Sequence, residues 1–372
     1  MITLGTVNIS EKTKKLMQEA LNKGIIGQEG DYIKKFEELL AGFFKVKHAV
    51  AVANGTLADA CALAAAKYED SCQRKEVIVP ALTFISQINA IYYNHLKPVF
   101  IDVNYDYQIN TEKIEEKINE NTLAIMPTHL LGWSAEMGKI LSLAKKYNLY
   151  VIEDSCEALG SRYQNQLCGT IGDMGCFSFF TSHTISTGEG GAVVTNNDKL
   201  ANLLRLIRNH GRKSERLEDK FIFPSIGFSA KMNVLEAIIG LGIIDELPQY
   251  IERRYQNMIK LNTLLGKNCF SEKGKRYAVP HAYPIMLESK EIRDKLLKLL
   301  PEKFGIEVRQ IFYSIPTQSE AYKFLEEKEG TYLIAEDIGR RGLYVPCHQN
   351  LSEKDIIKIF NTLKIKKIIK NE

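Results

Sequence analysis

The sequence predicts an α/β fold, with a large domain built on a mostly parallel sheet and a smaller C-terminal α/β domain. Three observations lead to this prediction. The chain has 372 residues, of which 45% are apolar and 25% charged, which suits an ordinary globular protein of two domains. Short β-branched runs alternate with amphipathic helical segments from about residue 47 to 196. After Asn233 the pattern becomes helical, and a shorter set of strands and helices follows.

The strands expected in the large domain are seven short apolar runs, at 48–53, 76–81, 97–103, 122–129, 149–154, 176–180 and 192–197. Nearly continuous apolar strands that alternate with helices are typical of a parallel sheet covered on both faces. Ligands of such sheets bind at the carboxyl ends of the strands. The residues that follow each run are therefore the candidates for a functional site.

The smaller domain is expected after a helical stretch that ends near Leu265 and is broken near Pro248. Its strands are expected at 281–287, 306–312 and 343–348, with a last helix at 354–363. We place the boundary at Leu247, which gives a cofactor-binding domain, 1–247, and a C-terminal domain, 248–372.

Charge and cysteine usage argue against several classes of protein. The net charge of +4 comes from 49 basic and 45 acidic residues, which is too even for a nucleic-acid or membrane surface. The seven cysteines show no pairing pattern and suggest free thiols in a reducing compartment. No apolar run resembles a signal peptide or a membrane span. We expect a cytoplasmic protein without nucleic-acid or membrane partners.

The first candidate site is the turn "AVANGTLADACALAAA" (51–66), where an apolar strand leads through Asn54 and Gly55 into an Ala-rich helix. The free N–H groups at such a helix start, together with Thr56, could hold a phosphate. A purely structural strand-to-helix turn fits the same residues.

The second candidate is the pair Glu153 and Asp154 at the end of "LYVIED" (149–154). Because side chains alternate along a strand, only one of these acids can enter a given site. A carboxylate there indicates a ligand, or alternatively a cap for the helical turn that follows.

The third candidate is the loop "CFSFFTSHTISTGEGGAVVTNN" (176–197), in which hydroxyls, a glycine turn and His183 lie between two expected strands. The stretches that contain these three candidates resemble the DegT/DnrJ/StrS sugar aminotransferase family. The same is true of segments 23–44, 77–103, 125–137, "GFSAKM" (227–232) and 342–356. The resemblance covers nearly the whole chain. It implies the aspartate aminotransferase fold, fold type I of pyridoxal-phosphate enzymes, a homodimer with active sites at the subunit interface, and nucleotide-linked keto sugars as substrates.

The resemblance also implies roles for individual residues. Phosphate-binding positions of the family match Gly55, Thr56 and Ser178. Phe84 matches the aromatic residue that stacks on the pyridine ring, and Asp154 the acid that keeps the ring nitrogen protonated.

Two further cofactor positions depart from the family's pattern. Glu157 stands where a Gln is frequent. Ser229 stands where many members have an Asn that reaches the partner's phosphate, so that contact is open.

The decisive departure is His183, which falls at the family's Schiff-base lysine. An imidazole cannot form the stable imine of a primary amine, so the cofactor should be held noncovalently. A small branch of the family resembles the chain at this position, the 3-dehydratases of nucleotide-linked 4-keto-6-deoxyhexoses, which carry a His after a Ser. They use pyridoxamine phosphate, restored by glutamate, and serve deoxysugar synthesis for O-antigen and other surface polysaccharides, lipopolysaccharide included.

His183 is then the general base and acid, because an imidazole with a pKa near 6.5 can take up and return a proton near neutral pH. Two alternatives stay open: a 4-aminotransferase in which His183 replaces the lysine, and a catalytically silent relative. The retained Asp154, Phe84 and phosphate-binding positions argue against the silent relative.

Other residues carry weaker expectations. One subtype of the branch holds an iron–sulfur cluster, but no cysteine lies between Cys176 and Cys269 to supply the ligands, so we expect the cluster-free type. His210 could contact substrate or the partner subunit, or cap a helix end. His129 could line the site, although packing suits it better. The spacing of the histidines predicts no metal site.

Overall fold

A computed structural model describes residues 1–27, 31–214, 216–266 and 276–364. Its centre is a seven-stranded sheet in the order β1-β9-β8-β5-β4-β2-β3. The sheet is parallel except for β9, which runs antiparallel to both β1 and β8. The bounds of the strands are β1 His48–Val52, β2 Glu76–Pro80, β3 Lys97–Ile101, β4 Thr122–Ile125, β5 Tyr150–Asp154, β8 Met174–Ser178 and β9 Gly191–Thr195.

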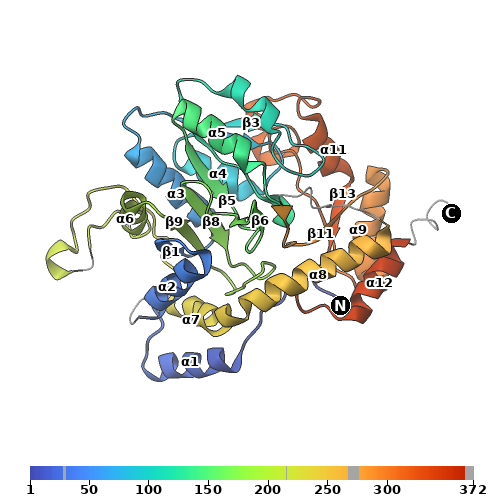
Figure 1. Ribbon diagram of the computed structural model, residues 1–372, viewed down its shortest axis with the longest axis horizontal. Helices are drawn as coiled ribbons and strands as arrows, with labels where there is room; N and C mark the ends of the chain where they lie inside the picture. Colours follow the sequence, from blue (N-terminus) through green and yellow to red (C-terminus); the bar gives the residue numbers. More distant parts are fainter. Residues whose placement is uncertain (28–30, 215, 267–275, 365–372) are drawn as a thin grey trace.

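Helices cover both faces of this sheet (Figure 1). On β1, Val50 and Val52 belong to the apolar cluster beneath the Ala-rich helix α3, whereas Ala49 and Ala51 join the cluster on the other face with α2 and α7. This alternation is the two-residue period of a strand that is buried on both sides. The helices of this part are α1 Glu11–Asn22, α2 Tyr32–Phe44, α3 Gly55–Glu69, α4 Ile85–Tyr93, α5 Met137–Tyr147, α6 Asp198–Ile207 and α7 Val234–Ile243.

Helix α8 (Leu247–Leu265) is the long helix that leads from the large sheet to the C-terminal part (Figure 1). It begins at the predicted break, with Pro248 in its first turn, where proline costs no hydrogen bond. A three-stranded sheet in the order β11-β13-β12 follows. Its strands are β11 Tyr283–Met286, β12 Arg309–Gln310 and β13 Gly342–Val345, and its helices are α9 Lys290–Phe304, α10 Ile315–Gln318, α11 Leu333–Arg341 and α12 Glu353–Lys364.

Most predicted elements are present, with some differences. A small sheet was not predicted, because its strands are only two residues long: β6 (Arg162–Tyr163), β7 (Gln166–Leu167) and β10 (Arg276–Tyr277). The chain also starts against the C-terminal part, where Ile2 pairs with Ile306. The domain boundary at Leu247 stays a prediction, and the largest apolar cluster contains residues from both sides of it.

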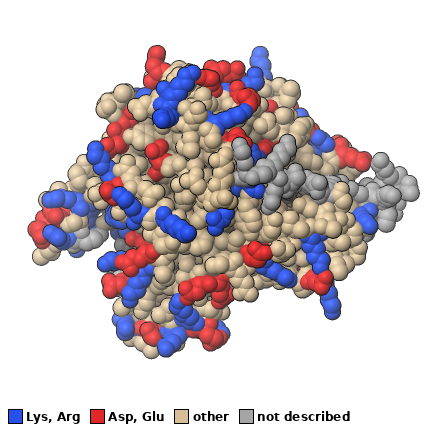
Figure 2. Space-filling view, viewed as in Figure 1, with Lys and Arg blue, Asp and Glu red and all other residues tan. Residues whose placement is uncertain are grey.

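The surface charge and the character of the helices bear on the partners that the sequence excludes. Lysine and arginine are interspersed with aspartate and glutamate over the face shown in Figure 2, without a large area of one sign. Among the described helices, none combines the length and the apolar character needed to cross a bilayer.

Candidate functional site

A cavity of about 400 Å³ lies where the carboxyl ends of β1, β5 and β8 meet residues of the C-terminal part. It brings together seven residues that the sequence predicts for the site: Gly55, Thr56, Phe84, Asp154, Glu157, Ser178 and His183. A cavity is therefore present at the carboxyl edge of the sheet, where parallel α/β sheets generally bind their ligands. The roles of these residues stay predictions.

The predicted phosphate cradle is the turn from β1 into α3. The Asn54 side chain caps the helix by accepting a hydrogen bond from the backbone N–H of Leu57, at 2.9 Å. A Cβ on Gly55 would lie 2.7 Å from Ser178 Cβ and 3.0 Å from Cys156 Sγ, so no larger residue fits there without displacement. The first N–H groups of the helix, the Thr56 hydroxyl and the Ser178 hydroxyl thus lie close together at the cavity, an arrangement that suits a phosphate.

The two acids at the end of β5 point to opposite sides, as the strand period requires. Asp154 lines the cavity, and its Oδ1 accepts a hydrogen bond from Cys156 N at 3.1 Å. Burial raises the pKa of Asp154, opposed by that N–H donor and by the nearby His129. A positively charged ligand nitrogen would favour the ionised form.

Glu153 is buried beneath the site, where backbone N–H groups of residues 169, 171 and 172 donate to its carboxylate at 2.7–2.8 Å. His129 lies beside it, fully buried, with Nε2 2.9 Å from Glu153 Oε2 and Nδ1 accepting from Ala135 N at 3.0 Å. His129 does not line the cavity. Both ring nitrogens are bonded inside the protein, which agrees with the packing role that the sequence favoured over a contact with substrate.

His183 lies in the wall of the cavity, on the loop between β8 and β9. No described residue forms a hydrogen bond with its ring, and its Nδ1 is shielded from solvent. Burial, together with the positive charge of Arg254, lowers the pKa of His183 to about 3. The imidazole is therefore neutral at physiological pH and able to accept a proton.

Phe84 and Phe312 form an aromatic side of the cavity, with ring centroids 5.3 Å apart. Half of the Phe84 side chain is exposed, so a planar ring could stack on it. Glu157 lies deeper, and its Oε2 accepts a hydrogen bond from Leu131 N at 2.7 Å. Burial raises the pKa of Glu157 to about 7, reinforced by the charge of Asp154 and opposed by the Leu131 N–H. Together with the cradle and Asp154, these features fit a pyridine ring that carries a phosphate.

A metal ion is less well suited to the floor of this cavity. Asp59, Asp154 and Cys156 place one ligand atom each within 4.8 Å of one another. However, burial and the charge of Asp154 raise the pKa of both Asp59 and Cys156 well above their ordinary values. A protonated carboxyl and a thiol are poor metal ligands. Asp59 and Cys156 thus serve better as neutral groups beside the Asp154 carboxyl than as metal ligands.

Sequence reasoning missed several residues that line the cavity, among them His281, Arg309, Phe312 and Tyr344. They come from the C-terminal part. Tyr344 lies in the family-like stretch 342–356, whereas no motif surrounds the other three, whose only signal was their position in the second set of expected strands.

His210 and Ser229 do not line this cavity. Both are exposed on the segment between α6 and α7, residues 208–214 and 216–233, which we call the projecting segment. Asn209 and Ser229 form a β-bridge in it, and His210 adopts a left-handed conformation, with φ of 62°. This segment projects from the body of the molecule (Figure 1). Their predicted contacts with substrate or with a partner's phosphate would therefore need a second subunit.

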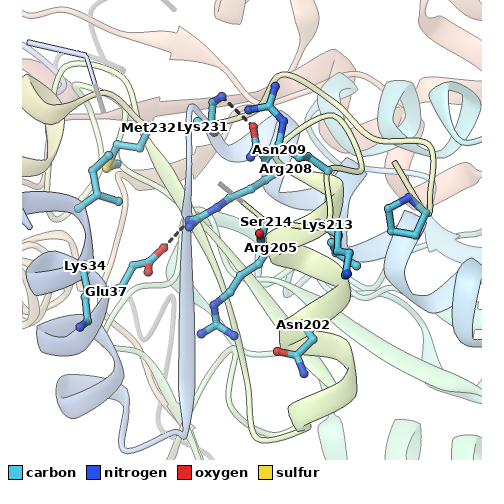
Figure 3. A pocket seen from close by; sticks show the side chains of 14 residues that line it. Lys34, Glu37, Asn202, Arg205, Arg208, Asn209, Lys213, Ser214, Lys231 and Met232 are labelled. Carbon is cyan, nitrogen blue, oxygen red and sulfur yellow. Dashed lines mark hydrogen bonds and ion pairs between the residues drawn. The ribbon is translucent and has the colours of Figure 1, made fainter. Parts of the chain in front are cut away.

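A second cavity, of about 600 Å³, adjoins the same segment and is strongly basic (Figure 3). Glu37 is the one carboxylate among its described lining residues, and it accepts a hydrogen bond from Arg208. Lys231 donates to Asn209 Oδ1 at 2.8 Å. The remaining basic residues of the lining are Lys34, Arg205, Arg212 and Lys213. This charge suits an anionic group.

Comparisons with known proteins agree with this geometry. The model of the DegT/DnrJ/EryC1/StrS aminotransferase family matches residues 7–364. GDP-perosamine synthase of Escherichia coli O157:H7 is 35% identical over 96% of each chain. The solved structure of Helicobacter pylori PseC, an aminotransferase of pseudoaminic acid biosynthesis, has a TM-score of 0.86 and 28% identity over 97% of each chain.

A second similar structure is a histidine-to-asparagine mutant of GDP-4-keto-6-deoxymannose-3-dehydratase with bound GDP-perosamine. It has a TM-score of 0.88 and 25% identity, over 98% of this chain and 100% of that one. The chain therefore belongs to the DegT/DnrJ/EryC1/StrS aminotransferase family, as an α/β enzyme of fold type I that uses pyridoxal or pyridoxamine phosphate.

Proposed function

We propose that this enzyme is a 3-dehydratase, which removes the carbon-3 hydroxyl of a nucleotide-linked 4-keto-6-deoxy sugar. The observation that carries the proposal is His183. None of the described residues that line the cavity is a lysine, and His183 stands where the family's lysine is expected. Without an amine, the site lacks the covalent anchor of ordinary transamination.

Each residue of the cavity has a proposed role in binding the cofactor. Gly55, Thr56 and Ser178 would hold the phosphate of pyridoxamine phosphate, and Phe84 would stack on its ring. Asp154 would keep the ring nitrogen protonated, with Glu157 at the ring's edge. The chemistry that the cofactor supplies is an amino group for the sugar's keto carbon and a ring that accepts electrons.

His183 would move the proton. Its Nδ1 is shielded, so Nε2 is the atom that would take a proton from the reacting carbon. Returned to the departing hydroxide, the same proton makes the hydroxide leave as water. The low pKa keeps the imidazole deprotonated at neutral pH, and it also makes the imidazole a weak base that holds a proton only briefly.

The names of the relatives support a GDP-linked substrate, because one relative is named GDP-perosamine synthase and the dehydratase structure contains bound GDP-perosamine. We propose glutamate as the amino donor that restores pyridoxamine phosphate. We further propose a cytoplasmic homodimer that serves surface-polysaccharide synthesis. The exposed apolar residues of the projecting segment, Phe221 and Ile226, support the dimer.

A different observation favours amination at carbon 4 as a second function. Two relatives named GDP-perosamine synthase, at 35% and 32% identity, cover nearly the whole chain. In that case His183 would act in a site that has lost the lysine.

The test incubates the purified protein with pyridoxal phosphate, glutamate and GDP-4-keto-6-deoxymannose, and identifies the sugar product by mass. We expect a product that has lost the carbon-3 oxygen, with release of ammonia and no covalent cofactor after borohydride reduction. A 4-amino product would support the second function instead. The His183→Lys variant is the matched control, because it should acquire a reducible covalent adduct at position 183.

A further inference from the structure

The cavity holds a second histidine, His281, to which the sequence assigned no role. The ring centroids of His183 and His281 are 5.0 Å apart, with their planes inclined at 47°. Both Nδ1 atoms are buried, and no described residue forms a hydrogen bond with either of them. Buried polar atoms without partners are uncommon and often mark a functional role.

Arg254 on α8 fixes the two histidines relative to each other. Its guanidinium is fully buried and donates to His183 O at 3.1 Å and to His281 O at 3.0 Å. One rigid planar group thus holds two segments that are almost a hundred residues apart in the sequence. The distance between the rings is therefore set by the fold rather than by chance contact of side chains.

The backbone of Leu131 links His281 to Glu157. Leu131 adopts a left-handed conformation, with φ of 58°. Its N–H donates to Glu157 Oε2 at 2.7 Å, and its carbonyl accepts from His281 N at 3.1 Å. The two side chains lie side by side as a result, with His281 Nε2 3.8 Å from Glu157 Oε1. A small rotation of the carboxyl group would close this distance to a hydrogen bond.

The charges around these groups place a proton preferentially on Glu157. Burial and the neighbouring His183, Arg254 and Arg309 lower the pKa of His281 well below its ordinary value. The third ring nearby, Tyr344, is held in its neutral form because burial raises its pKa. The pKa of about 7 at Glu157 is much higher than the pKa of about 3 at His183.

We propose that His281 is a positioning residue that acts through His183, passing the proton taken by His183 on to Glu157. The proton that arrives at Nε2 of His183 releases the one on Nδ1, which moves to Nδ1 of His281. His281 then gives the proton on its Nε2 to Oε1 of Glu157. Each ring ends neutral, and the carboxylate becomes a carboxylic acid. The reverse sequence returns the proton to His183.

The two Nδ1 atoms form no hydrogen bond with each other in this structure. Because the ring centroids are only 5.0 Å apart, a rotation about the Cβ–Cγ bonds that turns the Nδ1 edges toward each other would bring these atoms to hydrogen-bond distance for the transfer. The relay rests on the proposed function only in one respect, the removal of a proton by His183. That step is common to dehydration and amination, so the relay can be tested separately from the choice between them.

The first test uses the cofactor-free protein and nitrogen-15 NMR of its histidine rings at neutral pH. We expect Glu157→Gln to shift the ring resonances of His281, and His281→Phe to shift those of His183. Gln is the residue often found at position 157 in the family, so this variant should fold. His129, bonded to Glu153, is the internal control and should not move. Unchanged resonances of His281 in Glu157→Gln would overturn the relay.

The second test follows the conversion of bound pyridoxal phosphate to pyridoxamine phosphate by glutamate, which needs no sugar. In His281→Ala we expect the maximal rate to fall about tenfold or more, with little change in the glutamate concentration for half-maximal rate. Added imidazole should restore part of the rate.

His348→Ala is the matched control, because His348 is buried near Arg254 but does not line the cavity. Imidazole should have no effect on that variant. A normal rate in His281→Ala, or a loss that imidazole cannot restore, would refute the relay. If His281→Ala behaves as expected but the sugar is aminated, the relay stands and the dehydration is wrong.

Discussion

Burial changes what the His183 imidazole can do. The sequence led us to expect a base with a pKa near 6.5, which would both take and hold a proton at neutral pH. In the cavity, burial and Arg254 lower the pKa to about 3. A base with so low a pKa is deprotonated at neutral pH, but it binds a proton weakly and gives it up readily. Its usefulness therefore depends on neighbours such as Glu157 that can hold the proton longer.

At this scale, we predict that His183→Asn separates cofactor binding from catalysis. The phosphate cradle and Asp154 are untouched, so the dissociation constant of pyridoxamine phosphate should stay nearly unchanged. The turnover rate should fall on the order of 10²–10⁴-fold, the usual contribution of a positioned base. Cofactor fluorescence and single-turnover kinetics measure the two effects.

His95→Asn is the matched control for this variant. His95 is exposed and has φ of 54°, a conformation that Asn tolerates well. Its rate should equal that of the wild type. An equal rate in His183→Asn would remove His183 from the mechanism.

We also predict that His348 makes stability depend on pH. Burial lowers its pKa in the folded protein to about 4, whereas the unfolded chain titrates near 6.5. As the pH falls below 6.5, the unfolded chain binds a proton that the native state does not, so the free energy of unfolding decreases. Between pH 7 and 5, the wild type should lose about 2 kcal/mol more than His348→Asn. Urea unfolding at both values measures this, and equal losses would contradict it.

At the scale of elements, strand-to-helix turns were the most predictable part of the site. The turn at Asn54 and Gly55 combines a cap, a glycine and an Ala-rich helix, and each of these is visible in the sequence. The strand period shows that Glu153 and Asp154 face opposite sides, but the choice of Asp154 as the acid of the site came from the family resemblance.

The rest of the site could not be predicted, because it depends on contacts between distant segments. Arg254 reads as one of many basic residues of a helix, and only the fold shows that it is buried against five other groups. His281 lies just before a short strand without any motif. The reversed direction of β9 and the two-residue strands were invisible for the same reason, since pairing is set by tertiary structure.

We predict that Gly55→Ala weakens cofactor binding. The added methyl would lie 2.7 Å from Ser178 Cβ, which forces apart the two sides of the phosphate cradle. We expect the dissociation constant of pyridoxal phosphate to rise about tenfold or more, from the loss of one or two phosphate contacts. Fluorescence titration measures the change.

Gly42→Ala in α2 is the control for a glycine in a helix. No atom lies within 4 Å of the position of its Cβ, so the substitution should stabilise the protein by about 0.5–1 kcal/mol and leave binding unchanged. If Gly55→Ala binds the cofactor as well as Gly42→Ala does, the phosphate does not lie at this turn.

At the scale of the whole molecule, the described chain holds a cavity with most of the predicted groups, but Ser229 and His210 lie outside it. They share the projecting segment with exposed apolar side chains, and the basic cavity of Figure 3 adjoins it. Exposed apolar residues on a segment of this kind are typical of an interface. A homodimer would bring such a segment to the partner and would explain why two family positions appear far from the site.

The last prediction concerns the proposed homodimer. Phe221 and Ile226 are 79% and 84% exposed, and Leu217 in the same segment is 86% exposed. Replacing Phe221 and Ile226 together by Glu should therefore convert the dimer to a monomer in analytical ultracentrifugation, because charges would have to be buried in the interface. Turnover should fall with it, since His210 and Ser229 would no longer reach the partner. Leu333→Glu, at a position 65% exposed on α11, should stay dimeric and active. A fully active monomer would show that each chain carries a complete site.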